Sequence, residues 1–160
     1  MSYGLAHLNT VQAVDQAIMN EMERVVCIRF GADNDPQCTE LDGTLFQVAD
    51  RFVDKVSFYL VDCRTVRQYN KTFQWDGDCN LVFFYQNNIV KFDYGEGTTN
   101  RINFAISNPD VLSDIIETIY EGVRRGKEHI VTRNDYSPEN NYLSRLYPSN
   151  TAWPNANMNK

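Results

Sequence analysis

The stretch RFGADNDPQC, residues 29–38, joins two patterns that together decide the fold. It closes the apolar run RVVCIRF at 24–30, whose β-branched residues are typical of a buried strand. A Gly-Ala corner, an Asp-Pro pair and then Cys38, which has no Cys-x-x-Cys partner, follow this run. Beyond Pro36 an apolar stripe at helical spacing predicts a helix over about 37–53. A strand therefore runs into a helix at this corner.

The patterns around the corner predict an α/β fold. The expected elements are, in order, a helix over 9–22 with candidate capping residues at Asn9 and Gln12, the strand 24–30, the helix 37–53, a strand over 56–62, a short helix, and a hairpin of strands 81–86 and 89–94 around Asn87-Asn88. A last helix opens at Asn108-Pro109 and ends at Gly126. A helical crossover implies parallel strands, whereas the hairpin implies antiparallel ones. This order is that of a thioredoxin-like sandwich, with a mixed central sheet and helices on both faces.

Composition and charge limit the classes of function. The chain has 160 residues, enough for one hydrophobic core, and its net charge is −6. An acidic chain is unsuited to tight, unaided, non-specific binding of nucleic acid, because counterion release needs a basic surface. No apolar run has the length of a secretory signal or a membrane span. We therefore expect a soluble intracellular protein with protein partners and no membrane contact.

The residues that commonly hold metals or nucleotides do not form recognisable sites. The chain has four cysteines and two histidines, at Cys27, Cys38, Cys63, Cys79, His7 and His129. They lack the short spacings of zinc ligands, and the histidines have no nucleophile at a recognisable spacing. The glycines within 93–103 match no nucleotide-binding pattern. We expect no metal, no cofactor and no catalytic histidine.

Several blocks resemble the Dim family in order and spacing: MSYGLAHL, VDQAI, RVV-IRFG-D-DP-C, YLVD, C-LVFFY, DIIET-Y-G-R-G and DYS. These are small thioredoxin-like proteins of the spliceosomal U5 snRNP. The resemblance implies a nuclear, non-enzymatic pre-mRNA splicing factor, a subunit of the U5 snRNP and U4/U6.U5 tri-snRNP needed for spliceosome assembly and activation. It also implies large scaffold proteins as partners, RNA contact only within the assembled particle, and a monomer when isolated.

The resemblance extends over residues 1–137, which we expect to form one thioredoxin-like domain. Residues 138–160 are rich in asparagine and proline and show no sustained hydrophobic period. We expect them to be a flexible C-terminal extension.

The same resemblance implies a degenerate thioredoxin motif made of Arg29, Asn34, Asp35, Pro36 and Cys38. Asp35 falls where thioredoxins carry the attacking cysteine, and Cys38 falls at the resolving position. A carboxylate cannot form a mixed disulfide, since thiol exchange needs a thiolate. Arg29 replaces a buried aspartate, and Asn34 replaces a tryptophan that the Dim family itself usually keeps. No catalytic residue is expected.

Cys79 falls where thioredoxins have a proline beside the active site, so the resemblance places it near Cys38. The two cysteines form either a disulfide or a pair of reduced, buried thiols. A disulfide closing a loop of about 40 residues would add about 4 kcal/mol of stability on chain-entropy grounds. The alternative function is an atypical thiol-disulfide oxidoreductase that uses Cys38 and Cys79. A relative of the same fold that has left the U5 particle is a third possibility.

Three other features have two interpretations each. Arg29 either anchors a partner's carboxylate or pairs with an acidic neighbour in the chain. The cations of RRGK at 124–127 either contact RNA phosphates or compensate the helix dipole. The aromatic residues at 83–85 either stack on bases or belong to the core, and the core is the commoner role for consecutive aromatics on a strand.

Overall fold

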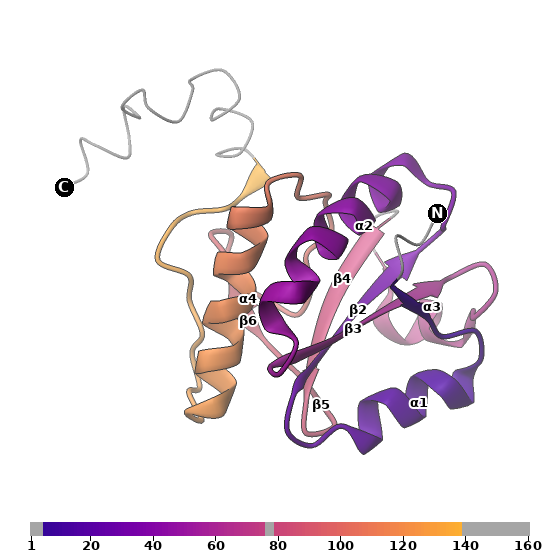
Figure 1. Cartoon of the computed structure of the whole chain (residues 1–160), viewed down its shortest axis with the longest axis horizontal. Helices are drawn as coiled ribbons and strands as arrows, with labels where there is room; N and C mark the ends of the chain where they lie inside the picture. The colour runs from indigo at the N-terminus through magenta and orange to yellow at the C-terminus, as the bar shows by residue number, and fades with distance from the viewer. Residues whose placement is uncertain (1–4, 76–78, 139–160) are drawn as a thin grey trace.

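The computed structural model describes residues 5–75 and 79–138, in which a mixed five-stranded sheet carries helices on both faces (Figure 1). The elements in chain order are β1 (Ala6–His7), α1 (Val11–Asn20), β2 (Val25–Gly31), α2 (Pro36–Ala49), the 3-10 turn η1 (Asp50–Phe52), β3 (Val56–Asp62), α3 (Gln68–Phe73), β4 (Cys79–Tyr85), β5 (Asn88–Ile89), β6 (Phe92–Asp93), β7 (Thr98–Thr99) and α4 (Pro109–Arg124). The strand order is β1-β3-β2-β4-β5, with β2 parallel to β3 and antiparallel to β4. The predicted fold class is confirmed.

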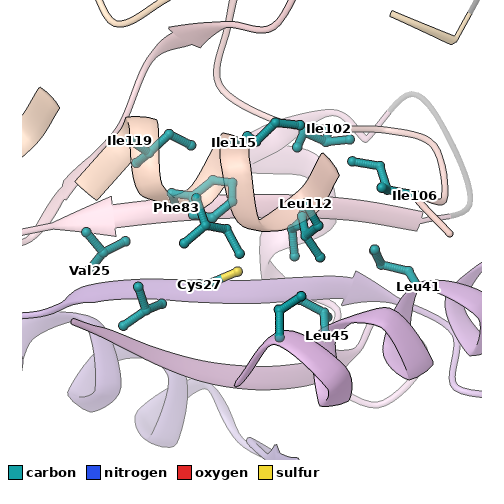
Figure 2. Close-up of a cluster of buried hydrophobic side chains, with 14 of the residues drawn as sticks. Val25, Cys27, Leu41, Leu45, Phe83, Ile102, Ile106, Leu112, Ile115 and Ile119 are labelled. Atoms are coloured by element: carbon teal, nitrogen blue, oxygen red, sulfur yellow. The ribbon is translucent and has the colours of Figure 1, made fainter. Parts of the chain in front are cut away.

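Side-chain alternation along β2 divides the core into two layers. Val26, Ile28 and Phe30 belong to the cluster that includes residues of α1 and α3. Val25 and Cys27 belong to the other cluster, under α2 and α4. Figure 2 shows the inward residues of α4 and α2 converging on the sheet in this second layer. Arg29 has the same parity as Cys27, so it lies under α2 as well.

The helix limits follow from local capping. The helix predicted over 37–53 is α2 continued by η1. Neither predicted capping residue of the first helix is its N-cap: this is Thr10, whose Oγ1 accepts a hydrogen bond from the Ala13 N–H at 3.0 Å. At α4 the expected cap Asn108 accepts from the Asp110 N–H at 2.8 Å, and Gly126 follows the last turn with φ +70°.

The hairpin differs from the prediction in its turn and in its second strand. Tyr85 pairs with Asn88, and the turn is formed by Gln86 and Asn87, both with positive φ, instead of by Asn87 and Asn88. The strand predicted over 89–94 breaks after two residues of β5, and β6 pairs with β7 in a separate two-stranded sheet. The reason is competition for the edge of β4, where Ile102 exchanges two hydrogen bonds with Leu81.

Candidate functional site

The α2 corner, defined as residues 29–38 with Cys79, is organised around the first turn of α2. Asp35 is the N-cap of this helix: its Oδ2 accepts hydrogen bonds from the N–H groups of Gln37 at 3.0 Å and Cys38 at 3.2 Å. Pro36 occupies the first helical position, where its missing N–H costs nothing. The carboxylate that stands in the place of a nucleophile therefore stabilises the helix start.

Cys38 and Cys79 lie in contact as free thiols, both fully buried. Cys79 pairs with Gly31 across the β2–β4 ladder, which brings it under the first turn of α2. A hydrogen bond with Cys38, together with burial, raises the pKa of the Cys79 thiol well above its ordinary value. Cys79 therefore stays protonated at neutral pH. The pKa of a third cysteine, Cys63, is raised to about 11 by burial and by Asp62.

Arg29 is fully buried and forms a two-point ion pair with Asp42 of α2. Its Nε lies 2.9 Å from Asp42 Oδ1, and its Nη2 lies 2.8 Å from Asp42 Oδ2. Nη1 donates to the carbonyls of Gly31 and Val61, and Nη2 also reaches Asp33 Oδ1 at 2.8 Å. Burial opposes the charge, but these hydrogen bonds outweigh it and raise the pKa of Arg29. The prediction of an acidic neighbour is confirmed, and a partner's carboxylate has no access.

Asp33 connects the buried ion pair of Arg29 and Asp42 to polar residues nearer the surface. Its Oδ2 lies 3.3 Å from His7 Nε2, and its N–H donates to Asp62 Oδ2 at 3.4 Å. Asp62 in turn pairs with Arg64, which lowers the pKa of Asp62 to about 2. These contacts connect the ends of β1, β2 and β3, so the carboxyl end of the parallel strands is held by polar contacts, and the one thiol there that is not fully buried is Cys63, which directly follows β3.

The outer surface of the corner is hollowed along α2. This hollow, the α2 groove, measures about 580 Å³, and Asn34, Pro36, Glu40 and Gln47 are among its lining residues. Asn34 is an exposed residue of this lining. Of the degenerate motif, the structure thus brings together Arg29, Asp35 and Cys38 with Cys79, and places Asn34 and Pro36 on the exposed side.

A second hollow of about 370 Å³ lies on the other side of the corner, between α3 and the ends of β2 and β4. Trp75 in its wall stacks on Phe30 with ring centroids 4.9 Å apart. Asn70, also in the wall, has a buried Oδ1 with no hydrogen-bond donor within residues 5–75 and 79–138. Mixed aromatic and polar walls are typical of sites that bind organic groups or peptide segments.

Two residues of the site were missed from the sequence. Asp42 follows Cys38 by four residues on α2, between the buried Leu41 and Leu45. A carboxylate within an apolar stripe signals a buried partner, and Arg29 is the matching cation. Trp75 gave no such signal, because its role depends on the packing of α3 against β2.

The other sequence candidates lie outside the corner. Arg124 and Arg125, at the end of α4, both form ion pairs with Glu121. Phe83 and Phe84 are buried in the two core layers, so their assignment to the core is confirmed. Within the described ranges no cluster of three histidine, cysteine or acidic side chains has the geometry to hold a metal ion. In those same ranges no helix has the length and apolarity needed to cross a bilayer.

The fold and the corner define a thioredoxin-like protein. Fasciola hepatica thioredoxin superimposes with a TM-score of 0.57 over 72% of this chain and 99% of its own length, at 17% identity, which shows the fold alone. The family described as mitosis protein DIM1 matches residues 4–136. "Mitosis protein dim1" of Schizosaccharomyces pombe is 40% identical over 142 residues, 89% of this chain and 100% of the relative. "Spliceosomal protein DIB1" of Eremothecium gossypii is 38% identical over 133 residues, 83% of this chain and 93% of the relative. The chain belongs to the DIM1 family.

Proposed function

We propose that this chain is a pre-mRNA splicing factor that acts without catalysis, as a protein-interaction subunit of the U5 snRNP and the tri-snRNP in the nucleus. Relatives named as spliceosomal proteins, aligned over most of both chains, support the assignment to splicing. The scaffold partners and the nuclear location belong to the proposal. The division into a domain over 1–137 and an extension over 138–160 stays a prediction, because residues 139–160 lie outside the described residues.

The observation that carries the non-enzymatic part is the use of Asp35. A thioredoxin-type reaction begins with attack by an accessible thiolate at the start of this helix. Here that position holds a carboxylate engaged with two backbone N–H groups, and Cys38 behind it is fully buried. The raised pKa of Cys79 removes the remaining candidate for a thiolate at the corner.

A second candidate function rests on the contact between Cys38 and Cys79. Two adjacent thiols can be oxidised to a disulfide by an external oxidant and so serve as an atypical oxidoreductase pair. Two measurements decide between the candidates: reduction of insulin disulfides by dithiothreitol with the purified chain present, and the same assay with Cys38→Ser. Turnover that depends on Cys38 would establish the oxidoreductase and exclude the non-enzymatic proposal.

The interaction surface that we propose is the α2 groove. It extends along α2 from Asn34, just before the helix, to Gln47, and both of these polar residues are exposed. The buried ion pair of Arg29 with Asp42 holds α2 rigidly on the sheet, so the groove is presented in a fixed shape. A pre-formed surface loses little conformational entropy when it binds a partner.

The test is affinity purification of the tagged full chain from nuclear extract, followed by identification of the co-purifying proteins and small nuclear RNAs. We expect U5 snRNA and splicing proteins to be recovered. The double variant Asn34→Arg/Gln47→Arg places two bulky cations in the groove and should reduce recovery at least tenfold. The matched control Gln12→Arg/Gln16→Arg adds the same charge on exposed positions of α1 and should not. Recovery of the unaltered chain without any splicing component would overturn the proposal.

A further inference from the structure

A third hollow lies at the end of the sheet opposite the thiol pair, where the last turn of α4 meets the β4–β5 hairpin. It measures about 400 Å³, and we name it the lysine hollow. Its inner lining includes Val90, Val123 and Ile130, which are buried or half-buried. Lys91 and Lys127 are exposed residues of the same lining. An aliphatic floor is thus flanked by two cations.

The backbone fixes the position of both lysines. At the end of α4, the Gly126 N–H donates to the Val123 carbonyl at 3.1 Å, and the Lys127 N–H donates to the Gly122 carbonyl at 2.9 Å. This is the Schellman arrangement, and it sets the direction of the chain at Lys127. Lys91 lies between two residues whose backbone is hydrogen-bonded. The Val90 N–H donates to the Phe83 carbonyl and the Asp93 N–H donates to the Ile130 carbonyl, each at 2.8 Å.

The two lysines differ from the neighbouring cations in their pairing. Arg124 and Arg125 share Glu121, at 2.9 and 3.4 Å. Over residues 5–75 and 79–138, neither Lys91 nor Lys127 forms an ion pair, and Glu128 is the one carboxylate in the lining. The chain as a whole carries a net charge of −6. The two unpaired lysines therefore make the surface beside this apolar floor locally basic, although the chain as a whole is acidic.

We propose that the lysine hollow is a second docking site, which takes an acidic segment of a partner protein. An apolar side chain of that segment enters the hollow against Val90 and Ile130, and flanking carboxylates pair with Lys91 and Lys127. Charge complementarity selects an acidic segment, and the aliphatic floor supplies affinity by burial of one side chain. The site is separate from the α2 groove, so either proposal can fail without the other.

The floor also distinguishes a peptide from RNA. Single-stranded nucleic acid is held by exposed aromatic rings and a continuous basic track. The lining of the lysine hollow has one aromatic ring, that of the half-buried Tyr85, beside the aliphatic Val90, Val123 and Ile130. Its two unpaired lysines do not form a continuous basic track. A long polyanion would also meet the negative charge of the rest of the chain, whereas a short acidic segment would not.

The experiment adds the heptapeptide EDELEDE, acetylated at its N-terminus and amidated at its C-terminus, to the isotope-labelled full chain. Binding is measured from the NMR shifts of the protein's backbone amides. We expect the largest amide shifts at residues 89–91 and 123–130. Lys91→Glu/Lys127→Glu should weaken binding roughly tenfold or more, since two attractions become repulsions. The control Lys71→Glu, an exposed lysine on α3, should leave the affinity within twofold. The peptide EDEAEDE, which lacks the apolar anchor, should bind about tenfold more weakly.

Four results of the peptide measurements would each overturn the proposal. They are the absence of binding at millimolar peptide, equal binding by the Lys91→Glu/Lys127→Glu variant, shifts that map to another face, and equal affinity for the anchorless peptide. A uridine dodecamer RNA serves as the competing class of ligand. If that RNA binds tighter than EDELEDE and its binding depends on the same two lysines, the hollow is an RNA contact and the peptide assignment is wrong.

Discussion

Arg29 and Asp42 are joined by two hydrogen bonds of 2.9 and 2.8 Å beneath α2, and both residues are excluded from solvent. The guanidinium also binds the Gly31 and Val61 carbonyls at the ends of β2 and β3. One side chain thus connects the helix that carries Cys38 to two strands of the sheet. Removing one partner of such a buried cation is costly, because the charge that remains is then unpaired in the interior.

Asp42→Asn should therefore be among the most destabilising single substitutions in the chain. It leaves the Arg29 charge buried with Asp33 as its one remaining ion-pair partner among the described residues, and such losses cost about 3–5 kcal/mol of unfolding free energy. Urea denaturation followed by circular dichroism measures the change. The double variant Arg29→Met/Asp42→Leu removes both charges and should recover most of the loss, because an apolar pair needs no hydrogen bonds.

The control for this prediction is Asp110→Asn. Asp110 pairs with Arg51 at 3.1 Å, but its side chain is 85% exposed. Exposed pairs contribute less than about 1 kcal/mol, so this variant should unfold almost as the unaltered chain does. If Asp42→Asn costs no more than Asp110→Asn, the buried pair is not a structural anchor.

Asp35→Cys should create a reactive thiol where none exists now. The substitution places a Cys-x-x-Cys sequence across the start of α2, where the helix N-terminus lowers the pKa of a thiol. We expect rapid reaction of one added thiol with Ellman's reagent at pH 7, and a disulfide from residue 35 to Cys38 after mild oxidation. The loss of the cap costs about 1 kcal/mol of stability. Asp35→Ser keeps the cap without sulfur and should gain no reactivity; equal reactivity in the two variants would contradict the prediction.

The sequence predicts those parts of the fold that depend on neighbours along the chain. Asn108-Pro109 and Gly126 mark the two ends of α4 because caps and left-handed residues act within a few positions. The turn at Gln86 and Asn87 was displaced by one residue from the prediction. Local preference favours positive φ at Asn87 and Asn88, whereas the structure places it at Gln86 and Asn87, so the pairing of Tyr85 with Asn88 decides the register.

The site was predictable to the extent that it depends on chain order. The strand-to-helix corner fixes the position of Asp35 and Cys38, but their neighbours come from distant segments. Asp42 pairs with Arg29 only because α2 covers the face of β2 to which Val25, Cys27 and Arg29 point. Cys79 meets Cys38 through the β2–β4 register; the family resemblance predicted this contact, but no local pattern contains it. Long-range pairings of this kind need the tertiary fold.

The pair of Asp62 with Arg64 predicts a measurable acid titration. The pKa of Asp62 is lowered from 3.8 to about 2, first by the hydrogen bond from Arg64. A carboxyl group with a lower pKa in the folded state adds stability above its unfolded pKa, and this contribution is lost as the pH falls towards 2. Arg64→Gln should move the Asp62 pKa up towards 3.8 in a carboxyl carbon NMR titration. Arg67→Gln, an exposed neighbour, should leave that pKa in place; a shift of equal size in both variants would show a general charge effect instead.

Gly122→Ala should destabilise the chain through one contact. A Cβ at residue 122 would lie 2.7 Å from Ile130 Cγ1 and 2.9 Å from its Cδ1, closer than carbon atoms pack. Overpacking of a buried site costs about 1–3 kcal/mol of unfolding free energy, and it would displace Ile130 from the floor of the lysine hollow.

Ile130→Ala alone also destabilises the chain, because it leaves a cavity. In the double variant Gly122→Ala/Ile130→Ala the added methyl fills part of that cavity, so the loss should be smaller than the sum of the single losses. Strict additivity in urea denaturation would show that the two residues do not share the space.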